Sequence, residues 1–213
     1  MLKAGVTGGN SYWSMELLIR RASMEDLEKI VSIHLKAFKG FFLTQLGDSF
    51  LRLYYSSFLQ NPQGVLLCAF VEDELVGFSA CSTRSRGFNQ SLIKSRPLCF
   101  LWEGFKVLFS SPKSAVRLLL NLKKGEKNND DLGQYAELFS LAVNPEFQNQ
   151  GIGGQLLKAT EKQVSDYNKQ ISLTTDFYDN DEVVSFYHNM GYSDLYYFIS
   201  YPNRKMIRMS KSL

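Results

Sequence analysis

Residues 137–157 read ELFSLAVNPEFQNQGIGGQLL, and this stretch decides the fold. It contains a short apolar run, 138–143, which predicts a buried strand because it is too short for a helix. Asn144 and Pro145 end that strand, since proline cannot donate to a sheet ladder and asparagine favours turns. A polar loop leads to the glycines of 151–154, after which apolar residues recur at helical spacing. The predicted order is strand, glycine loop and helix.

A glycine loop at the start of a helix suits a phosphate group. The first amides of a helix have no partner within the helix, and the aligned peptide dipoles leave a partial positive charge there. Glycines without Cβ atoms let a phosphate approach those amides closely, so the loop predicts a pyrophosphate site. The alternative is that these glycines only form a turn and a close packing point. Glycine spacing alone does not separate the two interpretations.

Two familiar phosphate motifs are excluded by the residues around these glycines. A dinucleotide fingerprint requires glycine three positions after Gly153, where this chain has Leu156. A P-loop requires a lysine followed by serine or threonine after the glycines, and no such pair is present.

The segment Gln148-Asn149-Gln150-Gly151-Ile152-Gly153 resembles the Q/R-x-x-G-x-G/A signature of the GNAT superfamily, the acyl-CoA-dependent N-acyltransferases. The run from Glu137 to Val143 also matches a family position, as do Asn180 and Tyr187 farther along the chain. The resemblance implies an α/β GNAT fold, with a mixed central sheet flanked by helices. It also implies acetyl-CoA as the acyl donor.

The resemblance implies two catalytic residues. Glu137 would accept the proton of the attacking amine, directly or through water. A free glutamate carboxylate has a pKa of about 4.3, so direct transfer requires a raised value or a water relay. Tyr187 matches the tyrosine of the family's Y-x-x-x-G-F/Y ending and would give a proton to the departing thiolate. The alternatives are a strand-end carboxylate paired with a basic residue and a core aromatic side chain.

The resemblance further implies a set of coenzyme-binding residues. Backbone groups of Leu141, Ala142 and Val143 would bind the pantetheine arm, and Asn180 would bind the pantetheine or adenosine side. A plain helix cap is the alternative for Asn180. The pyrophosphate would lie against Gln148, Asn149, Gln150, Gly151, Ile152, Gly153 and Gly154.

The implied reaction is acetyl transfer to a primary amine by direct attack in a ternary complex. This reaction needs no enzyme nucleophile, which agrees with the absence of a G-x-S-x-G motif. The expected acceptor is an amino sugar or another small-molecule amine, because 41–55 resembles glycan-pathway members of the family. The alternatives are a protein N-terminal acetyltransferase, a non-catalytic acyl-CoA-binding or regulatory module, and a membrane-surface protein based on 98–124.

Composition limits the remaining possibilities. The 213 residues, 45% of them apolar, predict a loose leader over 1–14 and one domain over 15–213. A net charge of +3 is too small to indicate nucleic acid binding. No C-x-x-C pair exists and the two histidines are far apart, so no metal is expected. No apolar run is long enough to span a membrane. Three cysteines, an odd number, indicate reduced core thiols and a cytoplasmic protein.

The rest of the chain predicts further elements around the central unit. The order from 17 to 81 is strand, two helices and a strand hairpin, and His34 falls on the apolar side of the first helix, as a hydrogen-bonded core-edge histidine. Residues 82–133 are a helical insertion that would form a lid, a dimer surface or a cover over the acceptor. Within this insertion the sequence predicts helices at 98–109 and 111–122 and a solvated loop at 125–131. After the helix that follows the glycine loop, it predicts a parallel strand at 171–175, a helix at 182–190 ended by Gly191, and a hairpin at 192–209.

Overall fold

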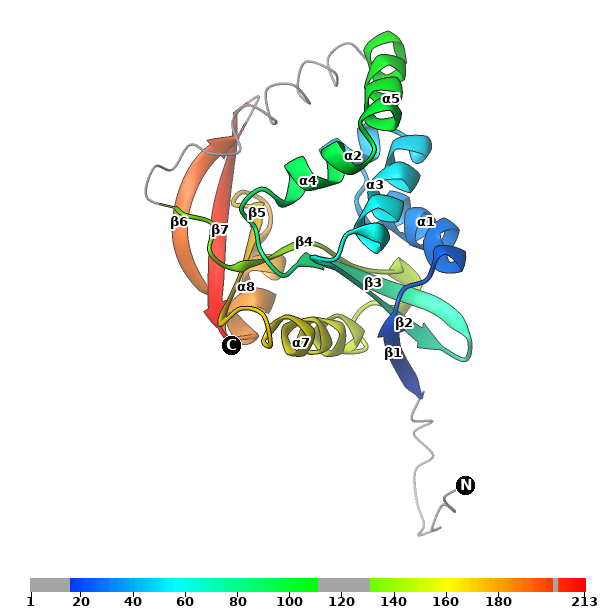
Figure 1. The fold of residues 1–213 in the computed structure, drawn as a ribbon. Coiled ribbons are helices and arrows are strands. Elements are labelled where there is room, and N and C mark those ends of the chain that lie inside the picture. Colours follow the sequence, from blue (N-terminus) through cyan, green and yellow to red (C-terminus); the bar gives the residue numbers. More distant parts are fainter. Residues whose placement is uncertain (1–15, 111–130, 201–202) are drawn as a thin grey trace.

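The computed structural model describes residues 16–110, 131–200 and 203–213. Its seven strands form one sheet in the order β1-β2-β3-β4-β5-β7-β6 (Figure 1). Only β4 and β5 run parallel, and every other pair is antiparallel. The predicted mixed sheet is therefore confirmed. The strands are β1 Leu17–Arg21, β2 Gly64–Val71, β3 Glu74–Ser82, β4 Ala136–Val143, β5 Gln170–Asp176, β6 Ser193–Ser200 and β7 Arg204–Ser212.

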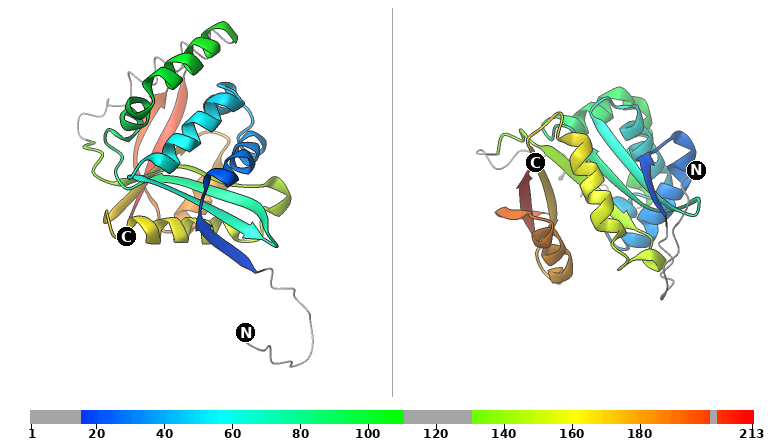
Figure 2. Two further views of the ribbon diagram at one scale, coloured as in Figure 1. Left: turned by 45° about the vertical axis from the view of Figure 1, so that its right-hand side comes forward. Right: turned by 90° about the horizontal axis from the view of Figure 1, so that it is seen from below.

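Helices cover both faces of the sheet (Figures 1 and 2). One face carries the helices before β4, and the other carries the helices after it, which gives the sheet two separate apolar cores. The helices of the first face are α1 Leu27–Ala37, α2 Phe42–Gln45, α3 Asp48–Gln60, α4 Phe88–Ser95 and α5 Pro97–Ser110; those of the second are α7 Ile152–Val164 and α8 Asp181–Asn189. Single 3₁₀ turns lie at Met24–Asp26 and Pro145–Phe147.

The first helix is tied to β1 by a carboxylate. Asp26 accepts hydrogen bonds from the amide and the hydroxyl of Ser23, at 2.7 and 2.9 Å, and from the guanidinium of Arg20. Arg20 holds the pKa of this carboxyl below its usual value. The chain therefore makes a 3₁₀ turn at Met24–Asp26 before α1 begins at Leu27.

His34 lies inside the core of the α1 face, as a hydrogen-bonded histidine. Its side chain is 2% exposed, and Nδ1 lies 2.7 Å from the hydroxyl of Tyr55 on α3. Tyr55 in turn donates to the hydroxyl of Ser140 on β4, at 3.2 Å. These contacts connect α1 and α3 to the central strand.

The central unit folds as its sequence predicts. β4 leads through a glycine loop into α7, which returns the chain to β5 beside β4. Ile152, Leu156 and Val164 on α7 are buried against the sheet at helical spacing. α8 ends at Gly191, whose φ of +89° belongs to the left-handed region that favours glycine at this position.

The insertion before β4 differs from its prediction in two respects. An additional helix, α4, precedes the predicted apolar helix, which is α5. Cys99 is exposed on α5, whereas Cys68 and Cys81 are buried, so only two of the three free thiols are core residues. The predicted helix at 111–122 and most of the loop at 125–131 lie outside the described residues.

Among the residues that the structure describes, no helix combines the length and the apolar character needed to span a bilayer.

Candidate active site

The central feature of the site is the point where β4 and β5 separate. The two strands are paired only at three positions, ending with Leu138 opposite Leu173. Beyond this point β4 continues along β3 to Val143, while β5 continues along β7 to Asp176 (Figure 1). The edge of β4 that faces β5 thus has no strand partner after Leu138, and this edge includes the predicted pantetheine-binding residues 141–143.

A bulge in β4 coincides with this separation. Ser140 lies opposite Ala80 and Leu138 lies opposite Cys81, so Phe139 is an extra residue on β4. Phe139 and Ser140 consequently both face the α1 and α3 side, where Phe139 packs against Phe58 and Ser140 binds Tyr55. Bulges increase strand twist, which helps to carry β4 away from β5.

The glycine loop lies at the exposed N-terminal end of α7. The backbone has positive φ at Asn149, +62°, and at Gly151, +77°. The first helical hydrogen bond joins the amide of Gln155 to the carbonyl of Gly151, so the amides of 152–154 have no acceptor within the helix. A Cβ atom on Gly151 would meet nothing within 4 Å, which shows that this position is open to the outside.

The later glycines of the loop face protein atoms. A Cβ atom on Gly153 would lie 3.8 Å from Val143 and 3.9 Å from Phe186, which is ordinary van der Waals contact. Gln148 donates from Nε2 to the carbonyl of Val143 at 3.2 Å, and this bond ties the loop to the end of β4. One of the backbone acceptors predicted for pantetheine is thus already bonded in this structure.

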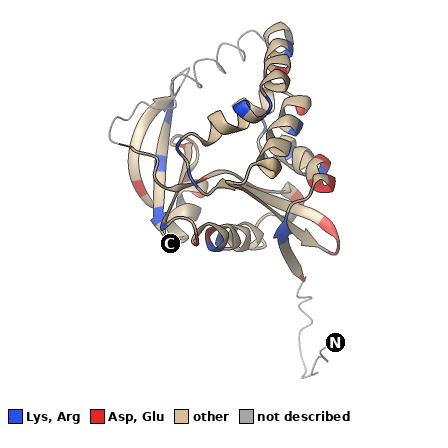
Figure 3. Cartoon of the chain, in the orientation of Figure 1, with Lys and Arg blue, Asp and Glu red and all other residues tan. Residues whose placement is uncertain are grey.

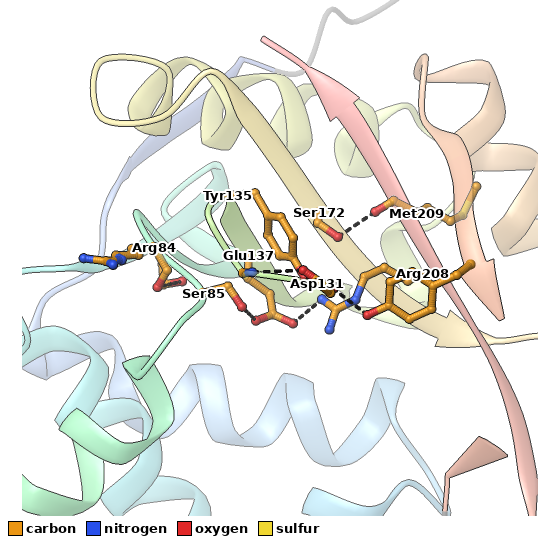
Figure 4. A network of polar contacts seen from close by, with 11 residues as sticks. Arg84, Ser85, Asp131, Tyr135, Glu137, Ser172, Arg208 and Met209 are labelled. Carbon is orange, nitrogen blue, oxygen red and sulfur yellow. Dashed lines mark hydrogen bonds and ion pairs between the residues drawn. The ribbon is translucent and has the colours of Figure 1, made fainter. Parts of the chain in front are cut away.

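Glu137 lies at the start of β4 within a polar network (Figure 4). Its Oε1 accepts a hydrogen bond from Nη1 of Arg208 on β7 at 2.6 Å, and its Oε2 accepts one from the hydroxyl of Ser85. The side chains of Glu137 and Arg208 are each 15% exposed. Sequence reasoning gave pairing with a basic residue as the alternative to catalysis for Glu137, and this pairing is present.

A second carboxylate lies close to the first. Asp131 accepts hydrogen bonds from the hydroxyls of Tyr135 and Tyr196, both at 2.6 Å, and from the amide of Gly133 at 2.9 Å. Burial raises the pKa of Asp131, but these donors and Arg208 outweigh burial and keep it below its usual value. Asp131, which was predicted to belong to a solvated loop, lies outside helix and strand, is half-buried and accepts these three hydrogen bonds.

Charge around Glu137 also acts on neighbouring groups. Burial would lower the pKa of Arg208, but the charges of Glu137 and Tyr135 raise it above its usual value. Tyr54 on α3 has its pKa raised by burial, by Tyr55 and by Glu137. The Glu137 carboxylate therefore faces the first helical layer, with α3 on one side and β7 on the other.

Tyr187 lies on the opposite face of the sheet. Its side chain is 8% exposed and packs in the α7 core, with ring centroids 5.1 Å from Phe186 and 5.5 Å from Tyr192. Burial raises the pKa of this phenol. Leu138 belongs to the same core, and Glu137, its neighbour on the strand, points to the other face. The two predicted catalytic residues are therefore separated by the sheet, and both roles stay predictions.

Asn180 precedes α8, but its side chain does not cap the helix. Nδ2 donates to the hydroxyl of Thr175 and to the carbonyl of Asp176, both at 2.9 Å, at the end of β5. The side-chain oxygen accepts none of these bonds. Asn180 thus fixes the end of the strand that separates from β4.

Sequence reasoning missed several residues of the polar network, namely Ser85, Asp131, Tyr135, Tyr196 and Arg208. A usable signal existed for Arg208 alone, since it is a charged residue between the apolar residues Ile207 and Met209 in a strand pattern. No group of three or more potential metal ligands occurs among the residues that the structure describes.

Comparison with known proteins gives a family match and many similar structures. Residues 120–192 match the sequence model of the acetyltransferase (GNAT) family. No curated protein matches the chain. Solved structures with the same fold include a ribosomal-protein-alanine N-acetyltransferase from Brucella melitensis, with a TM-score of 0.59 and 13% identity over 92% of this chain and 99% of that one.

Two further structures have comparable similarity. The PaiA N-acetyltransferase from Thermoplasma acidophilum, solved in complex with coenzyme A, has a TM-score of 0.58 and 18% identity over 93% of this chain and 100% of that one. A structure from Corynebacterium glutamicum, described as histone acetyltransferase HPA2 and related acetyltransferase, has a TM-score of 0.60 and 16% identity over 93% and 97%. At these identities the likeness shows the fold.

A mixed sheet that opens at its parallel pair, with a glycine loop starting the crossover helix, defines an acyltransferase of the α/β class. Residues 120–192 match the GNAT family model, and solved GNAT acetyltransferases share the fold of the chain.

Proposed function

We propose that the protein transfers the acetyl group of acetyl-CoA to a primary amine by direct attack in a ternary complex. The main support is the position of two features in the chain. The edge of β4 that β5 leaves unpaired is followed directly by the N-terminal end of α7, where the amides of 152–154 have no acceptor within the helix. GNAT enzymes use acetyl-CoA, and coenzyme A is bound in the Thermoplasma structure. The proposal includes a cytoplasmic location, which fits three free cysteines.

The coenzyme would lie along this stretch. The amides of Ile152, Gly153 and Gly154 would hold the pyrophosphate, with Gln148, Asn149 and Gln150 beside it and Gly151 leaving room for its approach. Backbone groups of Leu141, Ala142 and Val143 on this edge would bind the pantetheine arm, where the Val143 carbonyl now accepts a hydrogen bond from Gln148. Asn180 would add its side-chain oxygen, since its Nδ2 atom is already used.

In the reaction, the amine nitrogen forms a bond to the acetyl carbon while the carbon–sulfur bond breaks. The amine must lose a proton and the thiolate must gain one. Glu137, held by Arg208 and Ser85, would accept the amine proton, directly or through a water molecule that passes it on to the carboxylate. The raised pKa of Tyr187 keeps its phenol protonated at neutral pH, so it would supply a hydrogen bond to the departing sulfur.

The acceptor is proposed to be an amino sugar or another small amine. Phe41, which is 43% exposed and lies beneath the guanidinium of Arg204 at 5.6 Å, contributes aromatic surface. Sugar rings stack on aromatic side chains, which agrees with this class. A protein N-terminus is the second candidate acceptor.

The test has two parts, binding and turnover. Calorimetry should show acetyl-CoA binding to the purified chain, and well-folded protein that does not bind would contradict the proposal. Release of CoA is then measured over a panel of amino sugars, small amines and short peptides. Binding without turnover on any of them would favour a non-catalytic acyl-CoA module.

The roles of the two side chains are tested separately. Glu137→Gln and Tyr187→Phe should bind acetyl-CoA normally and lose at least tenfold in kcat. Matched controls are Glu74→Gln and Tyr167→Phe, which change an exposed carboxylate and an exposed phenol. Unchanged turnover in Glu137→Gln and Tyr187→Phe would show that neither residue transfers a proton.

A further inference from the structure

Helix α5 exposes an apolar side to solvent. Six large apolar side chains on it are between 49% and 78% exposed, and they recur every three or four residues, so they lie on one side of the helix. They are Leu98, Leu101, Trp102, Phe105, Leu108 and Phe109, here called the outer face of α5. A contiguous apolar surface of this kind marks an interaction site in a folded protein.

The other side of α5 holds the helix in place. Phe100 packs against Phe50 of α3 with ring centroids 6.0 Å apart, and Val107 is 3% exposed. Glu103 accepts hydrogen bonds from Ser49 on α3 and from Lys106, both at 2.7 Å. The orientation of α5 is therefore fixed by its inner side, and the exposed side chains of the outer face lie on the opposite side of the helix. Figures 1 and 2 show α5 at the periphery of the fold.

The aromatic side chains of the outer face contact one another. Trp102 and Phe105 stack with centroids 6.1 Å apart, and Phe105 and Phe109 lie 4.6 Å apart. Tryptophan and phenylalanine next to lysine are typical of helices that lie at the boundary of lipid and water. The 14 residues of α5 span about 21 Å, which is less than the thickness of about 30 Å of a bilayer core. A helix of this length suits a position in the plane of a membrane rather than across it.

Basic groups adjoin the outer face. A surface hollow between α3 and α5 is lined by Leu98 and Trp102 together with two basic residues, Arg52 and Arg96, and one acidic residue, Glu103. Arg96 donates one hydrogen bond, from Nη1 to the hydroxyl of Ser56 at 2.9 Å, while Arg52 also pairs with acidic residues. Lys94 is exposed on α4, which precedes α5 in the chain. Figure 3 shows basic residues on α4 and on α5. The hollow thus combines an apolar wall with cations.

The excess of basic over acidic residues in and next to α5 favours an anionic partner. From residue 94 to residue 110 the chain has three basic residues, Lys94, Arg96 and Lys106, and one acidic residue, Glu103. A second copy of the chain docked on the same face would bring like charges together. An anionic lipid surface offers both an apolar phase for the outer face and phosphates for the cations.

We propose that the outer face of α5 binds the surface of an anionic membrane, with the helix parallel to the bilayer plane and Arg52 and Arg96 directed at lipid phosphates. This inference does not depend on the acetyl transfer reaction. It gives the insertion between β3 and β4 a function distinct from that of the sheet.

Sedimentation of the full chain with lipid vesicles tests the proposal. The protein should pellet with vesicles of phosphatidylcholine mixed with phosphatidylserine, more weakly with phosphatidylcholine alone, and less as salt is added. Leu101→Glu and Phe109→Glu should each reduce partitioning at least tenfold. Arg52→Gln with Arg96→Gln should reduce it only for the anionic vesicles.

The control changes apolar residues that are exposed elsewhere. Leu195→Glu and Ile199→Glu alter β6, where the side chains are 45% and 56% exposed, and should leave vesicle binding unchanged. Circular dichroism melting checks that each variant is folded. Failure of the unmodified chain to pellet with anionic vesicles overturns the proposal. So does equal binding by Leu101→Glu, or a dimer in light scattering that Leu101→Glu dissociates without any vesicle binding.

Discussion

Arg208 and Glu137 are 71 positions apart in the sequence, yet Nη1 of Arg208 lies 2.6 Å from Oε1 of Glu137. The contact joins β7 to the start of β4, across β5, which lies between them. Glu137 belongs to the last but one residue pair of β4 and β5 before these two strands separate. Both side chains are 15% exposed, so the pair is largely removed from water. Glu137 is consequently a fixed acceptor at the position where the sheet opens.

Replacing Arg208 by methionine should leave the Glu137 carboxylate buried without its partner. Breaking a buried ion pair costs about 3 kcal/mol, and we expect a loss of that order in the free energy of unfolding by urea. The kcat for acetyl transfer should fall at least tenfold because Glu137 loses its fixed orientation.

A double variant separates the two effects. Arg208→Met with Glu137→Gln removes the unpaired charge, so it should recover most of the lost stability while staying slow. Equal stability of the double variant and Arg208→Met alone would contradict this account of the pair.

The sequence predicted the parts of the site that local patterns determine. The strand run 138–143, the glycine loop and α7 are contiguous, so their order and type follow from apolar spacing and turn residues alone. Gly191 was predicted to end α8 for the same reason, and its φ of +89° agrees.

The partners of Glu137 could not be predicted in this way. β7 inserts between β5 and β6, and only this arrangement brings Arg208 to β4. The contacts of Asp131 with Tyr135 and Tyr196 likewise depend on the position of β6. For α5, an apolar run predicts a helix, but it does not tell which side the protein covers.

The glycines at positions 151 and 153 should respond differently to alanine. Gly151 has a φ of +77°, so Gly151→Ala strains the backbone by about 1 kcal/mol although its Cβ meets no other atom. The new methyl group also occupies the open side of the loop, so acetyl-CoA affinity should fall at least tenfold in calorimetry.

Gly153→Ala is the matched control for Gly151→Ala. Its methyl group would only touch Val143 and Phe186 at ordinary distances, so stability and coenzyme affinity should stay within twofold of the unchanged protein. A larger loss of affinity in Gly153→Ala than in Gly151→Ala would indicate that the coenzyme does not lie at the open side of the loop.

Tyr187→Phe should slow the chemical step without lowering the affinity for acetyl-CoA. The ring stays in the α7 core and only the hydroxyl is lost, so the melting temperature should change little. If the hydroxyl binds the departing sulfur, kcat falls tenfold to a hundredfold while the acetyl-CoA dissociation constant stays the same. A higher dissociation constant with unchanged kcat would instead assign Tyr187 to binding.

His34 should make the stability of the fold depend on pH. Burial lowers the pKa of His34 from 6.5 to about 4, so the folded protein keeps the imidazole neutral over a range where the unfolded chain binds a proton. The unfolded state therefore gains protons first as the pH falls below about 6.5, and the contribution of His34 to stability is lost progressively down to about pH 4. The full difference corresponds to about 3 kcal/mol.

This pH dependence is measured by urea unfolding between pH 7.5 and pH 4.5, a range of about three units that contains most of the expected change. Because carboxylates also titrate near its lower end, the comparison is made between variants. His34→Gln, which keeps a polar group beside the Tyr55 hydroxyl, should have a lower stability at pH 7.5 but a flatter slope than the unchanged protein. His188→Gln changes the only other histidine, an exposed one bound to Asp194, and should keep the steep slope. Parallel slopes for His34→Gln and the unchanged protein would mean that His34 is protonated equally in both states, contrary to its burial between α1, α3 and β4.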